Sequence, residues 1–242
     1  MKTTTALLAA AVLLSAVPAM ADGILGQLPP EGSWAEFDVV GEGIDASGKV
    51  SVTLKGTLKL SSVGREMRDG EACRWIELET AIEIERGDKK GEQTETLKLL
   101  IPEQFLARGQ NPAAHALAAW KQTGQGAARE LDLQGDDARE LASMDELFHE
   151  SLNLQETRQG VEYAAPAGKF LCKQVHAKQV PEDRSAPIEF STQTWLSDEV
   201  PFGVVAYRYD KMRSQGGVSL GGRWMECKLA KTGKDAKSKI AK

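Results

Sequence analysis

The sequence contains few aromatic residues, and this shortage argues against one common class of carbohydrate-active enzyme. Phenylalanine, tryptophan and tyrosine make up 6% of the 242 residues. Carboxylates are abundant, but a glycosidase needs two of them set a few ångströms apart across a cleft, and such clefts usually carry aromatic platforms. The number of carboxylates alone therefore does not indicate a glycosidase.

Histidine is scarcer still, and its placement argues against a serine hydrolase. Residues 217–221 match the G-x-S-x-G nucleophile elbow, which needs a strand–turn–helix context and a later histidine. All three histidines, His115, His149 and His176, precede Ser219. We interpret the motif as a glycine-rich hairpin turn, and we do not expect an enzyme.

Long apolar runs are confined to the N-terminus. After residue 21 no stretch approaches the roughly 20 apolar residues that a transmembrane helix requires. Residues 1–21 contain Lys2, an apolar run and then Ala19-Met20-Ala21, which is typical of a secretory signal peptide. We expect cleavage near Ala21 and a periplasmic or secreted protein. Because no cysteine follows the cleavage site, a lipid anchor is not expected.

Only three cysteines are present, Cys73, Cys172 and Cys227. They allow at most one internal disulfide, and the pairing stays open. Export exposes a chain to oxidising conditions, so one disulfide plus a spare thiol is the first prediction. The alternative is that all three are buried and act as small apolar side chains.

The charges are unevenly distributed. The net charge is −5, yet residues 228–242 contain several lysines against the single Asp235. The remaining acidic body argues against a nucleic-acid partner, because it would repel phosphates. We predict one domain over residues 22–227 and a basic, disordered tail over residues 228–242.

Alternating apolar and polar residues predict several strands. In 50–60 and 73–85 every second residue is mainly apolar, which is the signature of a half-buried strand. A helix would scatter these apolar residues around its circumference. Gly56 interrupts the first run and indicates a bend or bulge. Further strands are predicted at 34–40, 94–101, 168–179, 188–196, 202–208 and 223–229.

The middle of the chain shows a helical period instead. Asn111 followed by Pro112 is a helix start, and apolar stripes predict helices at 111–121 and 137–150. Runs of strands on both sides of a helical middle indicate the α+β class. We therefore predict a curved, mainly antiparallel, half-barrel-like sheet packed on two or three helices.

Two short patterns resemble ligand sites but lack the required context. Gly41-x-Gly43 follows a strand, as a dinucleotide-binding turn does, but a second strand rather than a helix comes next. We therefore interpret it as a turn. Glu146-x-x-His149 has the spacing of di-iron bundles, which need a second copy of the motif. No cofactor and no metal are expected.

Two motifs in the C-terminal half carry a resemblance to known proteins. They are Gly168-Lys169-Phe170-x-Cys172 and Trp195-Leu196-Ser197-Asp198, the latter followed by Pro201 and Gly203. Together they resemble exported bacterial proteins of unknown function, some of which are similar to the outer-membrane lipoprotein carrier (LolA-like) half-barrel. The resemblance implies a curved sheet wrapped around helices, with an apolar concavity that could accept an acyl chain.

This resemblance leaves two functions open. The first is an exported, soluble, non-catalytic envelope protein that binds a lipid, lipoprotein or other apolar ligand in the concavity. The second is an accessory or structural envelope protein whose helices fill the concavity and which acts through protein–protein contacts. The candidate apolar face consists of Val50, Val52, Leu54, Leu58, Ile76, Leu78, Ile82 and Ile84.

Overall fold

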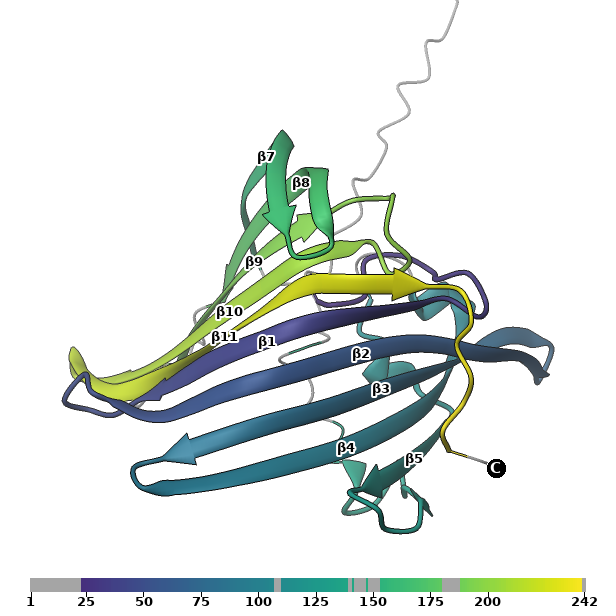
Figure 1. Ribbon diagram of the computed structural model, residues 1–242, viewed down its shortest axis with the longest axis horizontal. Coiled ribbons are helices and arrows are strands. Elements are labelled where there is room, and N and C mark those ends of the chain that lie inside the picture. The colour runs from purple at the N-terminus through teal and green to yellow at the C-terminus, as the bar shows by residue number, and fades with distance from the viewer. Residues whose placement is uncertain are drawn as a thin grey trace, which may run out of the picture.

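Eleven strands form one sheet in the computed structural model of the protein (Figure 1). The structure describes residues 23–106, 110–138, 153–179 and 188–240, together with Leu141 and Leu147. Within this part, no helix is long and apolar enough to cross a membrane. The elements are β1 (Trp34–Ile44), β2 (Val50–Arg68), β3 (Glu71–Arg86), β4 (Lys89–Pro102), the 3-10 helices η1 (Glu103–Leu106) and η2 (Ala113–His115), β5 (Ala118–Thr123), β6 (Arg129–Glu130), β7 (Asn153–Ala165), β8 (Gly168–Gln179), β9 (Ile188–Leu196), β10 (Val204–Gln215) and β11 (Val218–Gly233).

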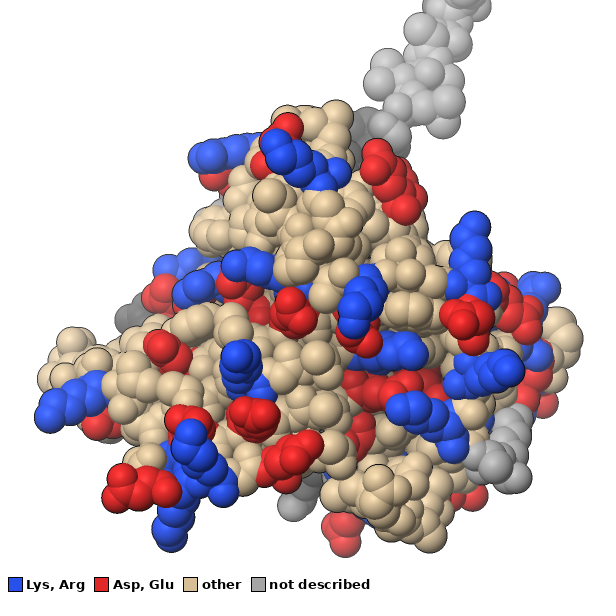
Figure 2. All heavy atoms as spheres, viewed as in Figure 1, with Lys and Arg blue, Asp and Glu red and all other residues tan. Residues whose placement is uncertain are grey.

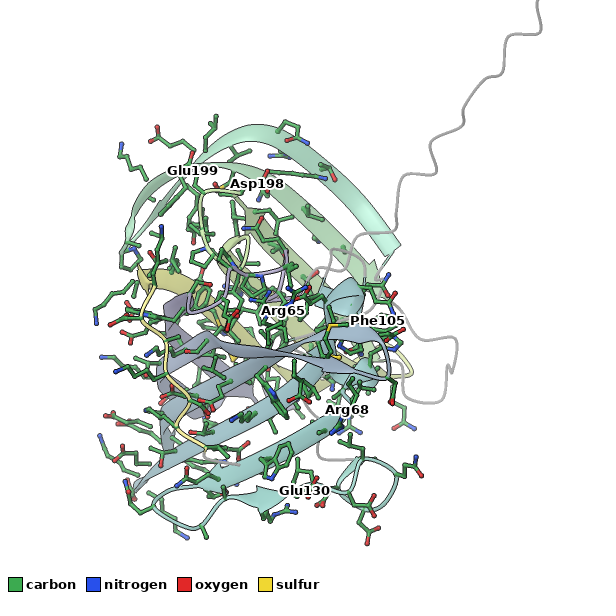
Figure 3. The ribbon with its side chains drawn as sticks, turned by 90° about the vertical axis from the view of Figure 1, so that its right-hand side faces the viewer. Arg65, Arg68, Phe105, Glu130, Asp198 and Glu199 are labelled. Carbon is green, nitrogen blue, oxygen red and sulfur yellow. The ribbon has the colours of Figure 1, made fainter. Side chains whose placement is uncertain are left out.

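The first and last strands meet in the middle of the sheet. The strand order is β6-β5-β4-β3-β2-β1-β11-β10-β9-β8-β7, so two meanders are joined by the β1–β11 pair. The sheet is curved, and Figure 3 shows it wrapping around side chains that gather on its concave side. Because neighbouring strands run antiparallel throughout, the predicted antiparallel sheet is confirmed.

The alternation in the sequence sets which face of each strand is buried. Phe37 of β1 opposes Leu58 of β2, and Leu60 opposes Leu78 of β3. All four side chains are buried on the concave side, while the intervening polar residues point to the convex side. Each strand predicted from the alternation occurs in the structure.

One predicted turn lies inside a strand. Gly41 and Gly43 belong to β1, and the turn begins only at Asp45, whose carboxylate accepts a hydrogen bond from the Lys49 backbone N–H at 3.1 Å. A Cβ atom on Gly41 would lie 2.7 Å from the Trp224 carbonyl oxygen. The close approach of β11, rather than a turn, therefore explains this glycine.

The chain's own residues pack the concave side of the sheet. The buried strand residues there include Phe37, Leu60, Ile76, Leu99, Tyr207 and Leu229. Connecting segments supply further buried residues to the same cluster: Ile24, Leu25, Leu106, Leu131 and Phe202. Burial of each large apolar side chain stabilises the fold by about 1.5–3 kcal/mol, so this cluster is the main core.

The predicted α+β class is wrong, because the middle of the chain adds strands to the sheet. Asn111 does cap a turn: its side-chain oxygen accepts hydrogen bonds from the backbone N–H groups of Ala113 at 3.1 Å and Ala114 at 3.3 Å. However, η2 ends after one turn, and Ala116 is extended (φ −64°, ψ 130°). β5 then pairs with β4. Hydrogen-bond partners on the β4 edge override the weak local helix signal.

The second predicted helix, 137–150, lies mostly outside the described residues. Leu141 is buried in the main core, and Leu147 packs against it. The Leu147 carbonyl oxygen also accepts a hydrogen bond from the Ile24 N–H at 2.8 Å. Leu141 and Leu147 thus contribute to the main core.

The C-terminal residues are ordered where a disordered tail was expected. β11 includes residues 228–233. Residues 234–240, which we call the C-terminal strap, then cross the convex side of the sheet (Figure 1). The Ala236 N–H donates to the Gly32 carbonyl oxygen at 2.8 Å, and Ile240 is only 1% exposed.

A buried arginine ties the connecting segments to one end of the sheet. Arg74 donates hydrogen bonds to Glu103 at 2.7 Å and to the Pro29 carbonyl oxygen at 3.3 Å. Arg65 reaches the same carboxylate at 3.0 Å, and Figure 3 shows Arg65 and Phe105 at this end. Burial opposes ionisation of Glu103, but the two arginines outweigh it and lower the pKa of Glu103 below its ordinary value.

Acid is expected to weaken this connection. Because the folded pKa of Glu103 is lowered, its contribution to stability is present above the unfolded pKa of about 4.3 and is lost as the pH falls through the folded pKa. We expect Glu103→Gln to reduce the free energy of unfolding at neutral pH and to flatten its decline in acid. Urea denaturation over a pH series measures both effects. Parallel pH curves for the two proteins would contradict the assignment.

Candidate functional site

The predicted apolar face lies on the adjacent strands β2 and β3, but its residues differ in burial. Leu58, Ile76 and Leu78 are at most 2% exposed. Leu54 opposes Ile84 in the register, and these two, with Val52 and Ile82, are only partly buried. Val50 lies at the β1–β2 turn and is 51% exposed. The two strands are therefore brought together as expected, while ligand binding by this face stays a prediction.

The inner part of this face belongs to the protein core. Leu58 and Leu78 are in the same buried cluster as Ile24 and Phe202, which come from connecting segments. At this inner part, side chains of the protein itself pack against the face. Only the outer part, around Leu54 and the β3 residues opposite it, retains partial exposure.

The convex side carries a polar groove, which we call the strap groove. It has a volume of about 450 Å³ and lies beside the C-terminal strap. Figure 2 shows that lysine, arginine and carboxylate side chains are interspersed over this side of the molecule. The lining residues include Thr57, Lys59, Glu79, Thr96, Gln122, Gln125 and Lys239.

Charges around the strap groove are largely compensated. The Lys59 ammonium lies 4.7 Å from the centre of the Trp34 ring, and Lys239 forms an ion pair with Glu79. Lys231 pairs with Glu36 at 2.9 Å, and this hydrogen bond raises the pKa of Lys231. With hydroxyl and amide groups between them, these residues offer many hydrogen bonds, which suits recognition of a polar partner.

Buried polar contacts hold the strap in place. The Glu77 carboxylate accepts hydrogen bonds from the Ser238 hydroxyl and from the Lys239 N–H at 2.9 Å. The Lys98 ammonium donates to Ser238 and to the Ile240 carbonyl oxygen, each at 2.7 Å. Sequence patterns did not reveal this site, because Glu77 and Lys98 occupy the polar positions of their strands and look solvent-exposed. The only sign of this anchor in the sequence is that Ser238 and Ile240 interrupt the lysine-rich residues 228–242.

The three cysteines are free and buried. Cys73 on β3 belongs to a small cluster with Trp75 and Leu100, whereas Cys172 on β8 and Cys227 on β11 belong to the main core. Burial raises the pKa of all three thiols, that of Cys172 to about 11 and that of Cys227 to about 12. They act as small apolar side chains here, and none is poised as a nucleophile.

These thiols are expected to resist modification in the folded protein. Only the thiolate reacts, and a raised pKa keeps the thiolate scarce at pH 8. We expect slow reaction with a chromogenic disulfide reagent under native conditions and rapid reaction of all three thiols in guanidinium chloride. A rapidly reacting thiol in the native protein, or fewer than three in the denatured protein, would contradict this arrangement.

The remaining sequence motifs have structural roles or lie outside the described residues. The G-x-S-x-G motif forms the β10–β11 hairpin, as predicted, and the Ser219 hydroxyl accepts a hydrogen bond from the Gly221 N–H at 3.2 Å. His115 stacks on Phe105, with ring centres 3.6 Å apart. Glu146 and His149 are outside the described residues. Within the described ranges, no three histidine, cysteine or acidic side chains group as metal ligands.

Comparisons with known proteins give only distant likenesses. No protein-family model and no curated protein match the sequence. One similar solved structure is described as an exported protein with a YmcC-like fold from Bacteroides fragilis: identity is 10%, coverage is 87% of this chain and 99% of that chain, and the TM-score is 0.32. Another is described as a lipoprotein from Parabacteroides distasonis, with 12% identity, coverage of 88% and 99%, and a TM-score of 0.30. These values are too low to support a function.

Proposed function

We propose that the protein is an exported, non-catalytic envelope protein that acts by binding another protein in the strap groove. The observation that carries this proposal is the contrast between the two faces of the sheet. Core side chains such as Ile24 and Phe202 occupy the concave side, whereas the convex side presents a groove of about 450 Å³. Export is supported by the signal-like pattern of residues 1–21.

The chemistry of the strap groove fits an extended, polar protein segment. Non-obligate protein interfaces are about as polar as the rest of the surface and carry many hydrogen bonds. Lys59 and Glu79 provide both charge signs at the groove, and Gln122 and Gln125 provide amide donors and acceptors. A partner segment with polar side chains and free backbone groups would exchange hydrogen bonds with them.

Site-specific crosslinking in cells tests the proposal. A photoreactive residue at Gln125, which is exposed at the strap groove, is expected to crosslink to one discrete envelope protein. The same residue at Lys169, exposed on the β7–β8 hairpin, is the control and should not. Thr96→Arg should abolish the crosslink by filling the groove. Equal crosslinking from both positions, or none from Gln125, would count against the proposal.

A second candidate function rests on the partial exposure of the outer concave face. Val52, Leu54, Ile82 and Ile84 are only partly buried there, so an apolar ligand could cover them and gain hydrophobic stabilisation. Native mass spectrometry of protein purified from its own envelope distinguishes the candidates. A bound lipid mass that disappears on denaturation and in Leu54→Asp would favour this function. A bare protein mass would favour the strap groove.

A further inference from the structure

The β1–β2 and β10–β11 turns lie together at one extremity of the molecule, opposite the end where the strap crosses the sheet (Figure 1). We call residues 44–50 and 212–222, which form the β1–β2 and β10–β11 turns there, the hairpin tip. Val50 opposes Ile44, Ile44 opposes Gly222, and Gly222 opposes Met212. The two turns are therefore neighbours in the sheet and form one surface.

The hairpin tip exposes large apolar side chains. Val218 is 65% exposed and Leu220 is 43% exposed, beside Val50 and Met212 at 51% and 38%. Leu220 is the extra residue of a bulge, because Arg213 opposes Gly221 while Ser214 opposes Ser219. Bulges redirect side chains, and clustered exposed apolar residues mark interaction sites. Val218 and Leu220 are exposed to solvent at the end of a hairpin, so they do not contribute to the core.

The same tip is positively charged although the protein as a whole is negative. The tip, residues 44–50 and 212–222, contains Lys49 and Arg213 against the single Asp45, whereas the chain as a whole has a net charge of −5. Lys49 is exposed in the adjacent turn. Figure 2 shows mainly tan atoms at this extremity, with blue atoms and a smaller number of red atoms at its outer end.

The acidic groups closest in register already have partners. The Asp45 carboxylate accepts hydrogen bonds from Ser47 and Lys49, which lower its pKa. Asp210 pairs with Arg208 at 2.9 Å. Glu189, which opposes Met212, pairs with a β8 lysine at 2.7 Å. Asp45 is thus engaged within its own turn, whereas the Lys49 and Arg213 side chains are exposed to solvent, where they can meet an external anion.

We propose that the hairpin tip docks the protein on an anionic phospholipid bilayer. Val218 and Leu220 enter the headgroup region, and Arg213 and Lys49 lie at the level of the phosphates. Apolar side chains combined with cations are the pattern of interfacial membrane anchors, and each cation adds to the attraction. A narrow, projecting tip can enter a lipid surface. The proposal is independent of the strap groove, which lies elsewhere on the molecule.

Vesicle sedimentation tests this docking. The purified protein should sediment with vesicles that contain phosphatidylglycerol and remain largely in solution with pure phosphatidylcholine. The double variant V218S/L220S should lower the partition coefficient at least about tenfold, and Arg213→Gln should lower it about fivefold. Added salt should weaken binding, because it screens the lipid charge. Both changes are at exposed positions, so urea denaturation should show unchanged stability.

The β2–β3 hairpin offers a matched control. Met67 is 66% exposed there, but Glu66 and Asp69 stand beside its arginines. Met67→Ser should leave vesicle binding unchanged. Absence of binding to the anionic vesicles would overturn the proposal, as would an equal loss in M67S or equal binding to neutral lipid. Loss of a co-purifying protein in V218S/L220S without vesicle binding would instead assign the tip to a protein partner.

Discussion

Replacing Glu77 by alanine is expected to lower the free energy of unfolding by about 3–5 kcal/mol, because it breaks a buried charge pair from one side. The Glu77 side chain is fully buried, and its carboxylate lies 3.7 Å from the Lys98 ammonium. The variant would remove the acceptor of the Lys239 N–H and leave Lys98 without its counter-charge. Urea denaturation measures the change.

Two further variants distinguish the effect of breaking the buried pair on stability from the effect of removing an ordinary surface charge. Glu85→Ala removes a carboxylate that is 45% exposed and pairs with Lys90, so it should cost about 0–1 kcal/mol. The double variant E77M/K98M should recover much of the loss, because neither charge is then buried alone. If E77A were no more destabilising than E85A, the strap would not be anchored by this pair.

Truncation after Gly233 tests the same contacts by removing the strap instead of the sheet residue. Removing residues 234–242 deletes Ser238 and Ile240, the partners of Glu77 and Lys98. Because E77A and the truncation disrupt one network, their effects should not add. Additive losses would mean that the strap is held by something other than Glu77.

Side-chain alternation made much of the sheet predictable from sequence. A strand period of two collects apolar residues on one face, so this period alone assigns residues such as Leu58 and Leu78 to the buried face. Neither the strand order nor the β1–β11 pair was predictable, because pairings between distant strands leave no local signal. The same local view could not tell that connecting segments, including Ile24 and Phe202, would fill the concavity.

The errors have specific physical causes. Asn111 forms a real cap, but a capping residue specifies one turn, and pairing with β4 then fixes the next residues as a strand. The strap was missed because the lysine content of residues 228–242 indicates disorder, whereas Ser238 and Ile240 bind the buried pair. In both cases contacts with residues distant in the sequence outweighed the local composition. Such contacts cannot be read from a short stretch of sequence.

Gly56 was expected to mark a bend or bulge, but the register of β2 is continuous there with both neighbours. A Cβ atom at this position would instead lie 2.0 Å from the Ala81 carbonyl oxygen and 2.9 Å from the Ile82 Cα. Both contacts are with the backbone of β3, which cannot move aside as a flexible side chain can. We expect Gly56→Ala to cost about 3 kcal/mol, at the upper end of ordinary overpacking, measured by urea denaturation.

Gly91 provides the matched control for this substitution. It lies in β4 opposite Ile84, on the same concave side as Gly56, but a Cβ atom there would meet nothing within 4 Å. Alanine restricts the unfolded chain more than glycine does, so Gly91→Ala should be neutral or slightly stabilising. A large loss in G56A alone would show that β2 and β3 approach too closely for any side chain at this point. Equal effects in both variants would attribute the cost to strand glycines in general and leave Gly56 without a special role.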